Sequence, residues 1–464
     1  MTQSMPFRFR ILSNVVLLLF VAVVSSNAQT KTMTLEDCIA IALENNTALK
    51  TSAFSYEVAK QDKLGSYRGI LPRVSTSAGR GKVETGPSEY LSDEPVGIDP
   101  ETGNVIYEER TRKIERSIRE SSSANVTISQ NLFDGGIWWN QIRKADADKR
   151  ASYYDYISQR DNTILSVQQA FFDYVKQMKL LEVDSIAVDR SRKQLERSQT
   201  MFELGATAQV DVYRSRVNLG NDRIAFLQQK NIVAQARKQL NIAMGRDPFT
   251  PINIKYEQLD LYEQLPRMNE LVEQAYENQP LIKKFNADVK SRKLAVSLAK
   301  GVNYPTVSTY VNYDRFHEDA VKVFSDFGQN YQLRYGINVS FDIFNGFSDY
   351  VNIQKAEINY KSTRENKEDY KRQLKSDIHQ RYADYKSYLD IIDINEVNLK
   401  AAREEFRLAN ERYQVGAGTA LEVRESQVNL TQAEQTLIAA KFNARLVLAQ
   451  LDNYLGKTYK NYSE

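Results

Sequence analysis

The 464-residue sequence predicts a mixed α and β protein that is predominantly α-helical and internally duplicated. Three observations lead to this fold class. Short motifs recur in the same order in both halves of the chain, two long stretches lack glycine and proline, and two pairs of segments alternate apolar with polar residues. Stretches without helix breakers favour long helices, and strict alternation is typical of strands with one buried face.

The chain begins with a segment that we expect to be removed. Two arginines precede an apolar run from Ile11 to Val24, and Ser26-Asn27-Ala28 offers a small-x-small cleavage site. This is the pattern of a secretory signal peptide, and the run is too short for a comfortable membrane-spanning helix. We therefore assign residues 1–28 to a signal peptide and expect export.

Composition argues against several kinds of site. One cysteine and two histidines leave no disulfide framework and no plausible zinc cluster. The 62 Lys and Arg residues against 59 Asp and Glu give no broad basic surface for nucleic acid. Cys38 lies ten residues past the expected cut, so we interpret it as a small apolar core residue. No catalytic motif stands out, so we expect no enzyme, metal or cofactor site.

The duplication is visible as motifs at constant offsets. Leu132-Phe-Asp-Gly135 and Gly205-Ala206 recur 211 residues later, whereas Pro72-Arg-Val-Ser75 recurs 233 residues later. The first copy therefore carries 22 extra residues between these motifs. The stretch Gly81–Glu120 is rich in Pro, Gly, Asp and Glu, which predicts a long polar loop there.

Two strand pairs are expected before the long helices. Residues 123–133 and 334–344 alternate apolar with polar side chains, with partners at about 73–81 and 306–313. Such strands, apolar on one face, are typical of an outer-membrane barrel. Four strands alone would leave unsatisfied edges in lipid. Spanning a membrane would need two copies, giving eight strands, or three, giving twelve with room for a channel.

Aromatic residues cluster where the chain leaves these strands: Phe133, Trp138, Trp139, Phe344 and Phe347. An aromatic belt marks a membrane–water boundary, although simple packing is the alternative. Asp134 and Asn345 are natural helix caps at the same junctions.

Each copy then predicts a long helix, a glycine turn and a second helix. Apolar residues keep a seven-residue repeat through both long stretches and resume it after Gly205 and Gly416. A strict heptad favours a left-handed supercoil. Ordinary core stripes of a bundle also explain the columns, but not stretches that would rise about 100 Å. The expected helices are 138–204, 207–244, 348–414 and 419–455.

Taken in order, the signal peptide, the repeat and the Leu-Phe-Asp-Gly and Val-Gly-Ala elements resemble the TolC family of outer-membrane efflux proteins. The resemblance covers essentially the whole mature chain. It implies a homotrimer with a 12-stranded transmembrane β-barrel, four strands per protomer, continued by a long antiparallel coiled-coil α-helical barrel across the periplasm. It also implies three partners: outer-membrane lipid, a periplasmic adaptor (membrane fusion) protein and an inner-membrane pump.

On this plan the chain divides into a signal peptide, two repeats, a linker and a tail. The linker and the tail are expected to join a collar around the middle of the tunnel. The expected bounds are 1–28 for the signal peptide, 29–245 for the first repeat, 246–266 for the linker, 267–456 for the second repeat and 457–464 for the tail.

The resemblance also assigns site residues. Gly205 and Gly416 would be the tips that meet the adaptor. Glutamates six and nine positions after the second glycine, Glu422 and Glu425, would form carboxylate rings at the pore entrance and attract cations. The alternative for both is a solvated helix face.

Two further links of the family hold its closed state. An acid–tyrosine pair falls on Asp211 and Tyr413. The positions of a second, arginine–threonine link hold Gly418 and Val210, so that link is missing. We therefore expect the fold to be kept and the stability of the closed state to differ.

The implied function is the exit duct of a tripartite efflux or type I secretion system, gated at its periplasmic tips. A non-conducting periplasmic coiled coil would also fit the heptads, but it leaves the amphipathic strands unexplained. An exported hydrolase is the enzymatic alternative, for which His317 in a polar loop and His379 beside a heptad residue offer no site. The sequence does not identify the substrate, the pump or the adaptor.

Overall fold

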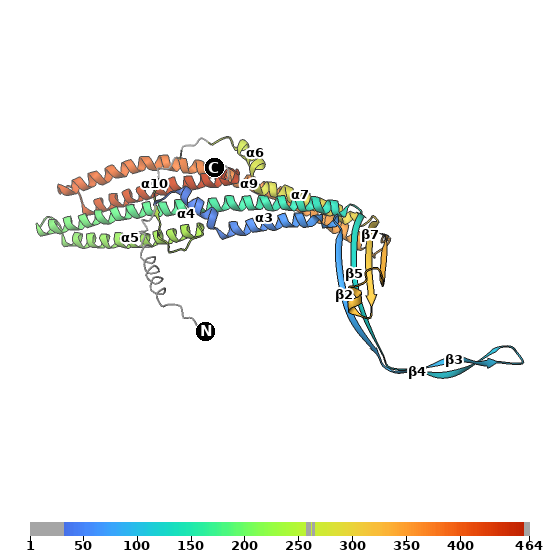
Figure 1. The fold of residues 1–464 in the computed structure, drawn as a ribbon. Coiled ribbons are helices and arrows are strands. Elements are labelled where there is room, and N and C mark those ends of the chain that lie inside the picture. Colours follow the sequence, from blue (N-terminus) through green and yellow to red (C-terminus); the bar gives the residue numbers. More distant parts are fainter. Residues whose placement is uncertain (1–31, 257–260, 262–264, 459–464) are drawn as a thin grey trace, which may run out of the picture. The chain divides into compact units, whose positions relative to one another are not determined.

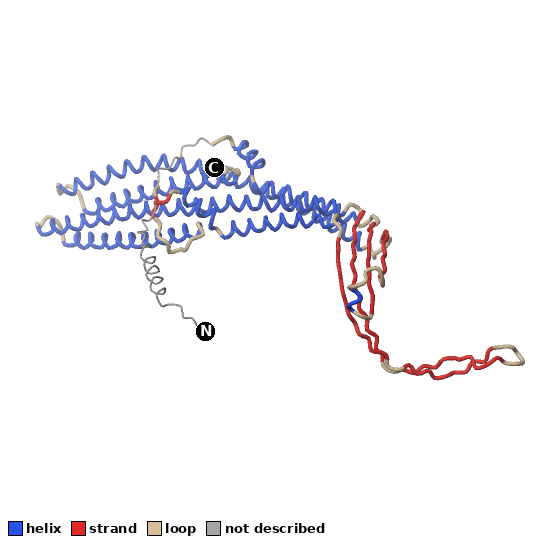
Figure 2. The backbone as a smooth tube through the Cα atoms, viewed as in Figure 1, coloured by secondary structure: helices blue, strands red, loops and turns tan. Residues whose placement is uncertain are grey.

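A computed structural model describes residues 32–256, 261 and 265–458. The expected signal peptide lies outside the described residues, as do parts of the expected linker and tail. The described chain is predominantly helical with some sheet, as predicted (Figures 1 and 2). It forms two compact units. One comprises the residues up to Tyr56, Ser152–Phe285 and the residues from Asn366 onward, and the other comprises Glu57–Ala151 and Asn286–Glu365.

The elements follow the same order twice, helices, then strands, then two long helices. The helices are α2 (Leu35–Asn45), α3 (Thr47–Gly65), α4 (Ile137–Glu203), α5 (Gln209–Ala243), α6 (Met268–Asn278), α7 (Pro280–Gly301), α8 (Ala320–Val323), α9 (Ser348–Gln414) and α10 (Ala420–Tyr454). The strands are β1 (Thr32–Met33), β2 (Arg73–Thr85), β3 (Ser88–Ile98), β4 (Val105–Ile114), β5 (Ser117–Asp134), β6 (Asn253–Ile254), β7 (Thr306–His317) and β8 (Tyr331–Ser340). No described helix has the length and apolar character needed to cross a membrane.

The long helices α4 and α9 contain 67 residues each. On α9, buried side chains recur every seven residues at Ile378, Tyr385, Ile392 and Leu399. These are the apolar columns that the sequence predicts, and their burial explains why the helix keeps one face toward its neighbours.

The duplication extends into the core of the first unit. Cys38, Val167 and Leu240 are fully buried in one cluster, which confirms the interpretation of Cys38 as a core residue. The positions that correspond to them in the second copy form another cluster: Leu271, Ile378 and Leu451. The two copies therefore use the same three-helix packing. Next to the first cluster, β6 of the expected linker pairs in parallel with β1.

The second unit contains an antiparallel sheet of order β2-β5-β7-β8. One register line across it joins Val74, Ile128, Val311 and Tyr335. Because side chains alternate between faces, these four lie on one face of the sheet and form an apolar row. The pairings between β2 and β5 and between β7 and β8 are the two expected strand pairs, and β5–β7 joins them.

The expectation of a long loop at Gly81–Glu120 was wrong. In the structure β2 and β5 extend into this stretch, and β3 and β4 form a two-stranded hairpin. Cross-strand ion pairs line it, including Lys113 with Glu89 at 2.8 Å and Arg112 with Glu94 at 2.6 Å. Neither face of this hairpin is buried, so its residues need not alternate between apolar and polar. Its polar composition therefore suggested a loop. His317, likewise expected in a loop, is the last residue of β7.

One buried acid stands apart from these ion pairs. Asp161 on α4 is 2% exposed, and neither carboxylate oxygen has a hydrogen-bond partner among the residues described. Burial in these surroundings raises the pKa of Asp161 to about 7.

Candidate functional site

The two long hairpins, α4–α5 and α9–α10, each turn at a glycine in the left-handed region. Gly205 has φ +74° and Gly416 has φ +77°, and an added Cβ would meet open space at either. Leu204 and Val415 beside them are largely exposed. Glycine is favoured at both turns for the left-handed backbone alone, while the exposed apolar neighbours offer a contact surface.

Glu422 and Glu425 lie on the first turns of α10, just after the second of these glycines. Thr419 caps the helix by accepting a hydrogen bond from the Glu422 backbone N–H at 3.2 Å. The Glu422 carboxylate is 3.8 Å from a guanidinium nitrogen of Arg412, and Glu425 is exposed. Both carboxylates therefore remain open to solvent in the single chain.

Arg424 lies between these glutamates in sequence but binds an acid on the other hairpin. Its Nη1 donates to Oδ2 of Asp222 at 2.7 Å and its Nη2 donates to Oδ1 at 3.0 Å. The two side chains are only 21% and 13% exposed. A bidentate, largely desolvated pair of this kind fixes geometry as well as charge. It ties α10 to α5.

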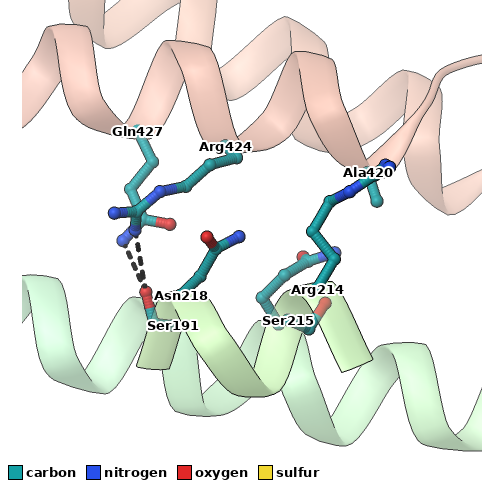
Figure 3. Close-up of a pocket in the computed structure, with 8 residues that line it drawn as sticks. Ser191, Arg214, Ser215, Asn218, Ala420, Arg424 and Gln427 are labelled. Carbon is teal, nitrogen blue, oxygen red and sulfur yellow. Dashed lines mark hydrogen bonds between the residues drawn. The ribbon is translucent and has the colours of Figure 1, made fainter. Parts of the chain in front are cut away.

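A third helix joins the same network. Ser191 on α4 donates to Asp222, and Gln427 on α10 donates to Ser191 Oγ at 2.9 Å and to the Ala187 carbonyl at 3.3 Å. Figure 3 shows Arg424 and Gln427 pointing from one hairpin toward Ser191 on the other. We call Ser191, Asp222, Arg424 and Gln427 the inter-hairpin network.

The sequence pattern did not predict this network, although it contains a signal for it. At an offset of 211 residues, Asp222 corresponds to Ala433 and Arg424 corresponds to Tyr213. The two copies of a duplicated chain can be aligned with each other. The copies have diverged wherever a charged residue in one corresponds to an uncharged residue in the other. A comparison of the copies would have included both residues among its candidates, together with others such as Arg190, which corresponds to Ala401.

Asp211 and Tyr413 are not hydrogen-bonded to each other in the single chain. Asp211 accepts from Thr207 Oγ1 at 2.8 Å and pairs with Arg214 at 3.5 Å. Tyr413 is 5% exposed, and its hydroxyl has no partner within the described chain. The link between Asp211 and Tyr413 stays a prediction. Gly418, at the position of the missing family link, lies close to the Arg412 side chain.

The five junction aromatics lie in the second unit. The Trp138 and Trp139 rings are 4.4 Å apart, and those of Phe344 and Phe347 are 5.5 Å apart. Asp134 accepts from the Trp138 backbone N–H at 3.0 Å, which confirms it as a helix cap. Trp138 packs against Gly69, whereas the other four rings are exposed: Phe133, Trp139, Phe344 and Phe347. Packing explains Trp138 only.

Comparison with known proteins gives one consistent family. The model of the outer membrane efflux protein family matches residues 38–246 and 271–457, which includes most of both copies. The probable efflux pump outer membrane protein TtgC of Pseudomonas putida is 21% identical over 88% of this chain and 80% of its own length. The outer membrane protein TolC of Vibrio cholerae is 20% identical over 89% of each chain.

Solved structures agree on the fold. The CmeC outer membrane channel of Campylobacter jejuni aligns with a TM-score of 0.77 at 18% identity, covering 92% of this chain and 88% of that chain. The open-state MtrE outer membrane channel of Neisseria gonorrhoeae aligns with a TM-score of 0.73 at 17% identity, covering 91% and 88%. With a family model matched across both repeats, the chain belongs to the outer membrane efflux protein family and is an outer-membrane protein.

Proposed function

We propose that the chain is the exit duct of a tripartite efflux or type I secretion system. As a homotrimer it would take substrates from an inner-membrane pump and a periplasmic adaptor and pass them across the periplasm and the outer membrane. One observation carries the proposal. The chain holds a four-stranded sheet that is apolar on one face, and its outer strands, β2 and β8, have no further strand partner within the described residues.

The two faces of this sheet suit two solvents. The apolar row through Val311 faces one side, and on the other Asp314 accepts from Asn125 at 2.5 Å and pairs with Arg334 at 2.9 Å. Lipid against the first face would solvate its apolar side chains, and water against the second face would solvate its charged and polar side chains. Open strand edges are costly in lipid. Three copies would close a twelve-stranded wall, whereas eight strands would leave an interior filled by side chains.

Gating is proposed at the periplasmic tips. Three copies would bring Glu422 and Glu425 into two rings of three carboxylates, and the inter-hairpin network would hold α10 against α4 and α5 while the channel is closed. Where the family's arginine–threonine link is missing, the Asp222–Arg424 pair would supply a substitute. The exposed tips at Gly205 and Gly416 would receive the adaptor, and the linker with β6 would belong to the collar.

Replacing Glu422 and Glu425 together with alanine is expected to reduce cation selectivity. Removing six carboxylates from a narrow entrance weakens the local negative potential, so the cation-to-anion permeability ratio should fall several-fold in planar bilayers. The matched control removes two exposed glutamates near the first tip, Glu196→Ala with Glu203→Ala. A protein that forms no pores at all would instead favour the non-conducting coiled coil.

Breaking the Asp222–Arg424 pair is expected to open the channel more often. Losing a charged, largely desolvated hydrogen-bonded pair costs the closed state about 2 kcal/mol, roughly a 30-fold shift in the closed–open equilibrium. Asp222→Ala, Arg424→Ala and the double variant should all raise conductance. The double variant should raise conductance no more than either single variant does. Arg407→Ala is the control, because the acids that Arg407 pairs with among the described residues, Glu404 and Glu411, both belong to its own helix. Equal conductance in all variants would exclude the pair from gating.

A further inference from the structure

The segment between β7 and β8, residues 318–330, folds back over the sheet; we call it the flap. Its short helix α8 contacts β5 and β7 (Figure 2). The Tyr313 hydroxyl donates to the Phe327 carbonyl at 3.0 Å, and Val323 is 2% exposed. Tyr313 is two residues from Val311, so both lie on the apolar face of the sheet. The flap therefore covers the end of the apolar face.

A buried arginine holds the flap in this position. Arg315, on the same face as Tyr313, is 2% exposed, and its Nη2 donates to the carbonyls of Lys322 at 3.0 Å, Ser325 and Asp326 at 3.1 Å. Its guanidinium carbon lies 4.7 Å from the centre of the Phe327 ring. No carboxylate partner of Arg315 exists among the described residues. Because a buried charge is costly, the bonds of Nη2 to these three carbonyls indicate that Arg315 positions the flap. Its Nε and Nη1 have no hydrogen-bond partner among the described residues.

Three large apolar side chains of the flap are exposed among charged residues that are also exposed, and no other described residue covers them. Val321, Phe324 and Phe327 are 73%, 62% and 65% exposed. Large apolar side chains concentrated on a short exposed segment mark an interaction site rather than scattered surface residues. On β8 the neighbouring apolar residues Tyr335 and Ile337 are equally exposed, so the flap continues the surface that the proposed function places against lipid.

The height of the sheet fits this continuation. Ser340 is the last residue of β8, near the junction aromatics, and Tyr331 is its first residue, near the flap. Ten residues at about 3.3 Å each, tilted by about 40°, rise about 25 Å, which is the usual height of the apolar band of an outer-membrane barrel. The flap and the junction aromatics would then lie at opposite membrane–water boundaries, where aromatic side chains are favoured.

We propose that the flap is a lipid anchor. Val321, Phe324 and Phe327 enter the boundary between acyl chains and headgroups of the outer leaflet, with Arg315 as the positioning residue, and fix the height of the sheet in the membrane. The inference rests on the proposed function in one respect, since it requires the apolar sheet face to meet lipid.

Site-directed spin labelling of the full chain in phosphatidylcholine vesicles tests the anchor. Nitroxides are attached after Phe324→Cys and Phe327→Cys, and their accessibility to oxygen, which concentrates in lipid, is compared with accessibility to a water-soluble nickel chelate. Tyr335→Cys reports the sheet face, and Tyr107→Cys, on the exposed β3–β4 hairpin, reports water. The native Cys38 should stay unlabelled, because it is fully buried and burial raises the pKa of its thiol to about 11.

The anchor predicts an oxygen preference at 324 and 327 that is several-fold higher than at 107 and close to that at 335. Nickel accessibility at 324 and 327 equal to that at 107, or exclusion of both reagents by a protein contact, would overturn the anchor while leaving the duct intact if 335 still prefers oxygen. Water accessibility at 335 would overturn the duct itself.

The role of Arg315 has its own readout. With a nitroxide at 324, Arg315→Leu should abolish the oxygen preference there without changing that at 335, and Arg315→Lys, which keeps a cationic donor, should retain most of it. An unchanged oxygen preference in Arg315→Leu would remove Arg315 from the account.

Discussion

Replacing Gly135 with alanine is expected to lower the stability of the folded protein strongly. Gly135 has φ +70°, and an added Cβ would lie 2.2 Å from the Gly301 carbonyl oxygen and 3.0 Å from Tyr304 Cβ. The backbone at the end of α7 would have to move. Left-handed strain and overpacking together cost about 3–5 kcal/mol, a large part of the stability of a typical domain. The measurement is the thermal midpoint of protein purified in detergent, with its yield in the outer membrane.

The chain offers two matched controls. Gly346 ends the corresponding motif of the second copy with φ +66°, and Gly136 has φ +80°, but an added Cβ would meet no atom within 4 Å at either. Alanine there costs only the left-handed backbone, about 1–2 kcal/mol. Equal losses at Gly135 and Gly346 would show that backbone strain alone decides, and that the close approach to Gly301 contributes nothing.

This pair of glycines marks the limit of prediction from the sequence. The repeated motif was enough to match Gly135 with Gly346, and both adopt the same backbone conformation. The sequence could not reveal that only Gly135 touches another helix end, because the approach depends on the packing of α7 and not on local pattern. The heptad columns were predictable for the opposite reason, since burial at seven-residue spacing follows from the helix period itself.

The inter-hairpin network and the flap also could not be predicted from the periodicity of apolar residues. Asp222 and Arg424 are separated by 202 residues and lie on different hairpins, so their pairing requires the register of α5 against α10. The flap could not be predicted because Arg315 occupies a position where the alternation of β7 calls for an apolar residue. A charged residue is not expected to be buried unless carbonyl groups accept its hydrogen bonds. Hydrophobic patterning locates elements, and polar contacts between distant elements need the fold.

Replacing Asp161 with asparagine is expected to stabilise the protein at neutral pH and to flatten its pH dependence. The pKa of Asp161 is raised from about 3.8 to about 7 in the folded state. Below pH 4 the carboxyl is protonated in both states and burial carries no ionic penalty. Between pH 4 and 7 the unfolded chain releases this proton while the folded chain keeps it, so the free energy of unfolding falls as pH rises. Three pKa units correspond to about 4 kcal/mol as an upper limit.

The difference between Asp161→Asn and the native protein isolates this group from all others that titrate. We expect thermal midpoints at pH 4 to be equal or slightly lower in the variant, because the amide also lacks partners, and to be several degrees higher at pH 8. Asp155→Asn, six residues earlier on α4, is the control. Asp155 pairs with Lys284 at 2.7 Å, and its side chain is half exposed. Losing this pair should lower stability by less than about 1 kcal/mol. A variant difference that does not change with pH would mean that Asp161 is ionised alike in the folded and unfolded chain.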